Sequence, residues 1–66
     1  MIVVEQVTTH WLTNAKGTAR RIFVVRGDSV TVEHWDKGYC TTNEQMSRVK
    51  AQGRYRWLLK QGWQKF

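Results

Sequence analysis

The sequence contains no proline, a single cysteine and no long apolar run. The lone Cys40 excludes a disulfide within the chain and is typical of a protein in the reducing cytoplasm. No stretch approaches the ~20 consecutive apolar residues of a membrane-spanning helix, and the N-terminal MIVVEQV lacks the basic residues that begin a signal peptide. We therefore expect a cytoplasmic protein without a membrane segment, in which residues 1–66 form a single domain.

Acidic residues are absent from the last third of the chain. All five acids lie at or before Glu44, where five lysines and arginines balance them. Six lysines and arginines follow with no acid among them, so the net charge of +6 belongs to this segment. A segment of one charge sign favours an anionic partner.

The sequence also lacks the residue groupings that catalysis and metal binding require. It has few carboxylates, no nucleophile beside a base and no glycine-rich phosphate loop. His10, His34, Asp36 and Cys40 match no standard zinc spacing. We therefore expect no enzyme, no metal and no cofactor, with His34 a hydrogen-bonded strand residue and Cys40 a small buried hydrophobe.

The first half of the chain has the composition and the turns of a β meander. An Asn-Ala-Lys-Gly turn at 14–17 and a two-residue Gly-Asp hairpin turn at 27–28 separate three runs rich in β-branched and aromatic residues. These runs predict strands at 2–13, 19–26 and 29–35. The sequence thus predicts three antiparallel strands within residues 1–36.

The C-terminal segment predicts a helix. Thr41-Thr42-Asn43-Glu44 has the form of a capping box, and Gly62 suits the left-handed residue that follows a helix. We expect a basic helix within residues 41–62. The predicted fold is a small α+β domain, a three-stranded antiparallel sheet followed by one C-terminal helix in the order β-β-β-α.

Two apolar stripes run along this predicted helix at the 3.6-residue period. The stripe expected to pack on the sheet consists of Ala51, Tyr55, Leu58 and Leu59. The opposite stripe, expected to be a contact surface, consists of Met46, Val49, Gly53 and Trp57. A glycine inside a helix costs about 1 kcal/mol relative to alanine, so Gly53 either permits a close approach or is simply tolerated.

Basic and aromatic residues together indicate nucleic-acid contact, because lysine and arginine neutralise phosphates and exposed aromatics stack on bases. Strand arginines could add to this surface, since small sheets can enter a major groove. They could equally be ordinary charges that protect an edge strand. The candidate binding residues are Arg20, Arg26, Lys50, Arg54, Arg56, Trp57 and Lys60.

Two functions remain open at this point. The first is a small non-catalytic protein that binds DNA or RNA through the basic-aromatic helix and the strand arginines. The second is an interaction adaptor or inhibitor, in which the strip of Met46, Val49, Gly53 and Trp57 docks onto an acidic partner protein or onto a second copy as a homodimer.

A Trp-Leu pair in the first strand (11–12) and a helix that ends in Leu-Leu-x-x-Gly-Trp (58–63) resemble a family of small uncharacterised cyanobacterial and cyanophage proteins. The resemblance covers about residues 10–65 and implies no activity, because that family has no established function. The element order is also similar to plant AP2-type and integrase N-terminal domains, which read DNA with a three-stranded sheet. None of their specific motifs is present, so this similarity concerns architecture alone.

Overall fold

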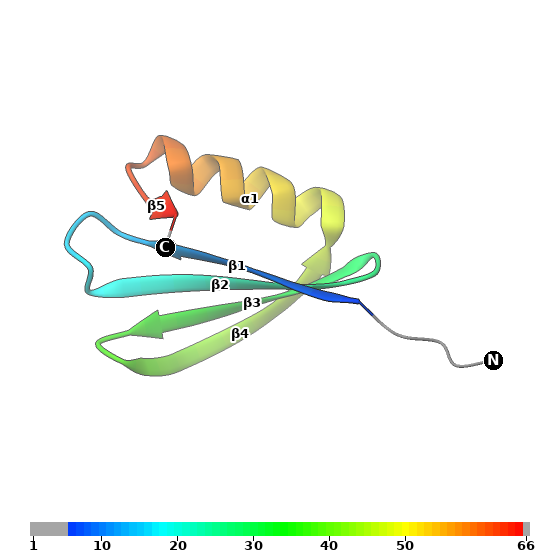
Figure 1. The fold of residues 1–66 in the computed structure, drawn as a ribbon, viewed down its shortest axis with the longest axis horizontal. Helices are drawn as coiled ribbons and strands as arrows, with labels where there is room; N and C mark the ends of the chain where they lie inside the picture. The colour runs from blue at the N-terminus through cyan, green and yellow to red at the C-terminus, as the bar shows by residue number, and fades with distance from the viewer. Residues whose placement is uncertain (1–5, 66) are drawn as a thin grey trace.

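A computed structural model describes residues 6–65 as a five-stranded antiparallel sheet with one helix packed on one of its faces (Figure 1). The elements in chain order are β1 (Val7–Thr13), β2 (Ala19–Arg26), β3 (Ser29–Asp36), β4 (Tyr39–Ser47), α1 (Arg48–Lys60) and β5 (Gln64–Lys65). Their order across the sheet is β4-β3-β2-β1-β5. No helix within residues 6–65 is both long and apolar enough to cross a membrane.

The predicted meander is confirmed for β1, β2 and β3. Gly27 adopts a φ of 58° in the two-residue turn that pairs Arg26 with Ser29. In the turn between β1 and β2, the side-chain oxygen of Asn14 accepts a hydrogen bond of 2.9 Å from the Thr18 backbone N–H. The first strand is observed from Val7 onward, and the earlier part of its predicted range, 2–5, lies outside the described residues.

The prediction of a helix over residues 41–62 is wrong at its N-terminal end, and the sheet has five strands rather than three. Residues Tyr39–Ser47 form β4, which pairs with β3 along its length. The hairpin arises because Lys37 and Gly38 both adopt positive φ, 53° and 86°, as a type I′ turn requires. This turn returns the chain alongside β3 before any helix can begin.

The predicted capping box is therefore not a cap. Thr41 Oγ1 donates instead to the His34 carbonyl at 3.1 Å across the β3–β4 pair. Helix α1 begins later, after Ser47, whose Oγ accepts a hydrogen bond of 3.3 Å from the Lys50 backbone N–H. Serine at this position satisfies one of the free N–H groups of the first turn.

Helix α1 ends at Lys60, and Gly62 is the left-handed residue that follows it, as predicted. Gly62 has a φ of 94° and donates its N–H to Leu59, while Trp63 donates to Leu58, both at 3.1 Å. These two bonds form a Schellman motif. The turn directs the chain back to the sheet, where β5 pairs with Leu12 and Thr13 of β1.

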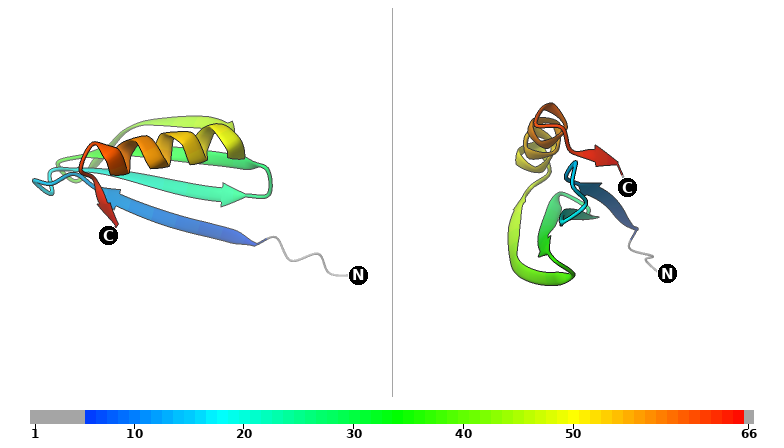
Figure 2. Two further views of the ribbon diagram at one scale, coloured as in Figure 1. Left: turned by 90° about the horizontal axis from the view of Figure 1, so that it is seen from above. Right: turned by 90° about the vertical axis from the view of Figure 1, so that its left-hand side faces the viewer.

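The core lies between α1 and one face of the sheet (Figure 2). Ala51 and Leu58 of the predicted packing stripe are buried, and Tyr55 packs against them with its ring 5.5 Å from Phe23 in an edge-to-face contact. Leu59 remains 38% exposed. The buried residues of this core are Leu12, Phe23, Val30, Val32, Met46, Ala51 and Leu58.

The other face of the sheet has no element of residues 6–65 packed over it, and we call it the open sheet face. Because side chains alternate along a strand, residues that neighbour a buried core residue point to this face. The strand register places on it Trp11, Arg20, Ile22, Val24, Arg26, Glu33 and Trp35.

Candidate nucleic-acid interface

The predicted binding residues lie on two opposite sides of the molecule. Arg20 and Arg26 share the open sheet face, as their spacing predicted, and Arg21 points to the helix side. The two arginines are six residues apart, or about 20 Å along the strand at ~3.3 Å per residue. Helix α1 lies across the other face, so the structure does not bring them together with the basic residues of the helix (Figure 2).

The solvent side of α1, which we call the outer helix face, consists of Val49, Lys50, Gly53, Arg56, Trp57 and Lys60. Val49 is 80% exposed and Trp57 is 55% exposed. Met46 does not belong to this surface, contrary to prediction, because it lies on β4 and is buried in the core. A Cβ on Gly53 would meet no atom within 4 Å apart from its chain neighbours and the backbone of its own helix, so no other close neighbour within the described chain requires glycine there.

Arg54 differs from the other helix cations because it turns toward the sheet. Its Nη1 lies 3.9 Å from Glu44 Oε2, and Glu44 Oε1 lies 3.1 Å from His34 Nε2. The carboxylate of Glu44 partly offsets the charge of Arg54, which makes this arginine less available to phosphate than Arg56 or Lys60.

His34 is the centre of this charged cluster. Its buried Nε2 atom lies 3.1 Å from Glu44 Oε1, so Glu44 is the polar partner of this strand histidine. Burial lowers the pKa of His34, and the neighbouring Arg21 lowers it further. Arg21 itself lies 5.0 Å from the ring centroid of Trp63, a cation–π contact that uses its charge within the fold.

The open sheet face contains an aromatic cluster that sequence reasoning missed. Ile22 is only 6% exposed although no element covers it. Trp11 is its direct neighbour on β1, and Trp35 is its diagonal neighbour on β3, within reach of a large side chain. Trp35 donates its indole N–H to Glu33 Oε1 at 2.9 Å, which orients the ring.

A cavity of about 480 Å³ lies beside this cluster. Its walls come from three neighbouring strands and from the two turns at one end of the sheet. The side chains that matter below are Trp11, Arg20, Ile22, Trp35 and Lys37. The one available sequence signal was that the residues two positions before and after each tryptophan, which alternate onto its face, are polar; this indicates a partly exposed face.

Both turns beside the cavity are held in place by hydrogen bonds. The Lys37 backbone N–H donates to the Thr18 carbonyl at 2.9 Å, which joins the β3–β4 turn to the β1–β2 turn. Figure 1 shows the two turns at the same end of the sheet. The Asn14 side chain also donates to Thr18 Oγ1 at 2.9 Å. The cavity is therefore bordered by a fixed backbone.

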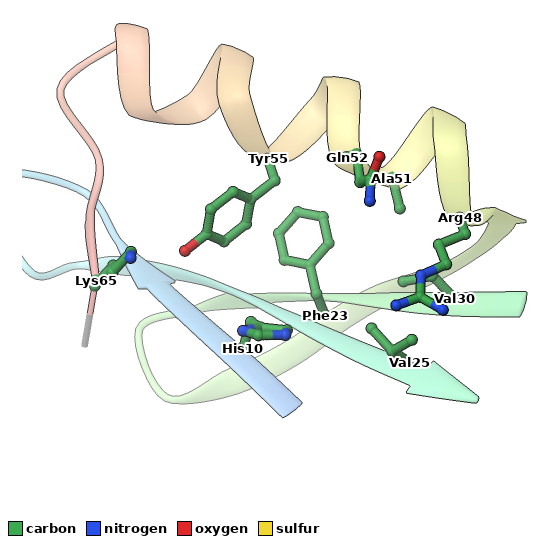
Figure 3. A pocket seen from close by; sticks show the side chains of 9 residues that line it. All are labelled: His10, Phe23, Val25, Val30, Arg48, Ala51, Gln52, Tyr55 and Lys65. Atoms are coloured by element: carbon green, nitrogen blue, oxygen red, sulfur yellow. The ribbon is translucent and has the colours of Figure 1, made fainter. Parts of the chain in front are cut away.

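A second hollow, of about 310 Å³, opens between α1 and the strands β1 and β2 (Figure 3). It exists because the helix packs mainly on β3 and β4 and leaves the β1 side less covered. Phe23, Val25 and Tyr55 line its apolar interior, with Arg48 and Lys65 at its ends. Since its interior is the core itself, we interpret it as an incompletely covered edge of the core.

Within residues 6–65, no group of three or more histidine, cysteine, aspartate or glutamate side chains is placed to hold a metal ion. The expectation of a buried Cys40 is wrong, because the residue is exposed on the edge strand β4. Its Sγ lies 3.2 Å from Asn43 Oδ1.

Comparisons of the chain with known protein families, curated proteins and solved structures find no match. The resemblance to small cyanobacterial and cyanophage proteins therefore stays a prediction.

Proposed function

We propose that this protein binds nucleic acid without catalysing a reaction, and that its open sheet face is the contact surface. The observation that carries the proposal is the presence of Trp11 and Trp35 beside Arg20 on a sheet face that no described element covers, with Arg26 farther along the same face. Aromatic rings stack on bases and arginines neutralise phosphates, so this combination suits a nucleic acid. Helix α1 supports the sheet from behind.

The charge distribution supports the same proposal. The chain has a net charge of +6, and Lys50, Arg56 and Lys60 are exposed on the outer helix face. These cations face away from the bound strand but still raise the positive potential around the protein. A positive potential speeds the approach of a polyanion and weakens as salt is added.

The test is a titration of labelled single-stranded and duplex oligonucleotides with the full chain at several salt concentrations, followed by anisotropy. We expect log K to fall linearly with log salt, by about 0.7 per phosphate contact for a single strand. Absence of binding even at low salt would refute the proposal.

Two matched charge reversals locate the surface. Arg20→Glu with Arg26→Glu should abolish most of the binding, whereas Arg56→Glu with Lys60→Glu should weaken it only modestly by lowering the general attraction. Circular dichroism is the control that should show that both variants fold. The reverse ranking would move the contact surface to α1.

The exposure of Val49 and Trp57 favours a second candidate function, docking of an acidic protein or a second copy of this chain on the outer helix face. In this case Trp57→Ala should harm association far more than charge reversal does, because the aromatic side chain would be the anchor. Sedimentation of the parent and of Trp57→Ala, alone and with an acidic partner, measures this. A chain that stays monomeric and binds no acidic protein would exclude it.

A further inference from the structure

We infer that the cavity at the turn end of the open sheet face is a subsite for one nucleotide of a single strand. Its base would stack against Trp11 and Trp35, and its phosphate would lie near Arg20 and Lys37. This inference rests on the proposed function and deepens it, because it names the form of nucleic acid and the residues that read it.

The size and lining of the cavity fit such a ligand. Its volume of about 480 Å³ lies within the range of roughly 300–1,000 Å³ that is usual for small-ligand sites. Ile22 forms an apolar floor between the two tryptophans. A site with apolar walls and a few charged groups at its border is typical of pockets that hold a flat, partly polar molecule.

The aromatic walls favour a single strand over a duplex. Bases in a duplex are stacked on one another and expose only their edges, whereas bases in a single strand can turn their faces to a protein ring. Trp11 is 40% exposed and Trp35 is partly buried, so both rings present surface to the cavity. The hydrogen bond between Trp35 and Glu33 holds one of these rings in a fixed orientation.

The charges at the cavity complement a phosphate. Arg20 and Lys37 line it, and no acidic side chain of residues 6–65 does so. The nearest acids in the sequence are Glu33, whose carboxylate accepts the Trp35 indole N–H, and Asp36, which is exposed at the end of β3. Among the described residues that line the cavity, a polyanion therefore meets two cations.

The site is also largely preorganised. Lys37 is held at a φ of 53° by the type I′ turn, and its backbone N–H is bonded to Thr18 of the facing turn. A ligand thus orders few additional groups when it binds, which reduces the entropic cost of association.

The experiment compares a short labelled oligothymidylate with an abasic strand of the same length and with a duplex, using the full chain. We expect the oligothymidylate to bind more tightly than either. Trp11→Leu and Trp35→Leu keep an apolar cover over Ile22 but remove the stacking surface. Each should weaken oligothymidylate binding by about 5- to 100-fold and leave abasic-strand binding unchanged.

Trp57→Leu is the matched control, because it removes an exposed tryptophan from the outer helix face. Its affinity for every strand should equal that of the parent. Lys37→Asn keeps a residue that tolerates positive φ and removes the charge, so it should reduce the salt slope by about 0.7. It serves as the decisive variant if circular dichroism shows that a leucine variant fails to fold.

Equal affinity for the oligothymidylate and the abasic strand, with no effect of Lys37→Asn, would overturn the nucleotide subsite but leave nucleic-acid binding standing. Failure of every strand to bind the parent would overturn both proposals. An oligouridylate of the same length tests whether the ligand is RNA or DNA. Tighter binding than the oligothymidylate indicates RNA, and weaker binding indicates DNA. Equal binding indicates that the site recognises the base and phosphate that both strands share.

Discussion

The two faces of the sheet have similar apolar content, but only one of them is covered. On the helix side, Leu12, Phe23 and Val32 are at most 3% exposed, whereas on the open side Trp11 and Trp35 keep part of their surface in solvent. The single 13-residue helix packs on one of the two faces. The apolar residues of the other face therefore contribute less to the core than their number suggests, and part of their apolar surface stays accessible to solvent.

Charged residues on the two faces also differ in what they contact. On the helix side, Arg21, His34 and Glu44 lie close together under α1 and interact within the fold. On the open side, Arg20 and Lys37 border a cavity. The same residue types thus lie under the helix on one face and beside a cavity on the other.

The largest expected effect compares how much apolar residues on the covered and the open sheet face contribute to the free energy of unfolding. Leu12→Ala should lower the free energy of unfolding by about 2–5 kcal/mol, because it leaves a cavity in a small core. Val24→Ala on the open face should cost at most about 1 kcal/mol, because less area is lost there. Urea denaturation followed by circular dichroism measures both. Equal losses would show that the open face is as important to the core as the covered one.

An intermediate effect concerns pH and the covered face. The pKa of His34 is lowered in the folded state, chiefly by burial, while the unfolded chain binds the proton near the ordinary histidine value of 6.5. The unfolded state therefore takes up the proton first as the pH falls. Stability is complete above pH 6.5 and decreases as the pH drops below it.

The groups that face His34 are Arg21 from β2, Glu44 from β4 and Arg54 from α1. Denaturation curves across this pH range should show the loss in the parent chain and a weaker dependence in His34→Gln. A pH dependence unchanged by His34→Gln would contradict the prediction.

The smallest expected effect separates the open sheet face from the outer helix face. Gly53→Ala should stabilise the protein by about 1 kcal/mol, because alanine favours a helix and an added Cβ meets no atom within 4 Å. Oligonucleotide affinity should not change if the strand lies on the sheet. Weaker binding after this substitution would mean that a ligand approaches the α1 backbone closely.

Local signals were sufficient for the parts of the fold that depend on neighbouring residues. The hairpin turn at Gly27, the Schellman motif at Gly62 and the alternation that separates Arg20 from Arg21 were all predictable, because each is set by the φ preference of one residue or by the period of a strand. The charge asymmetry followed directly from composition.

The candidate site was harder to predict, because its residues come from separate strands. Trp11 and Trp35 are far apart in the chain, and only the register of β1, β2 and β3 places them around Ile22. Register depends on pairing between segments, and a shift by one residue would move every side chain to the other face. The cations of the helix could be recognised from the sequence because they lie close together in it.

The sequence by itself determined the positive net charge, the first three strands with their turns, and the end of the helix, because these depend on composition and local conformation. Only the tertiary structure decided that Tyr39–Ser47 forms a strand. Its Thr-Thr-Asn-Glu segment is compatible with a helix start or with a strand, and pairing with β3 selects the strand by satisfying its backbone hydrogen bonds and burying Met46. The tertiary structure also left one face of the sheet without a covering element of residues 6–65, because a single helix can pack on only one of the two faces.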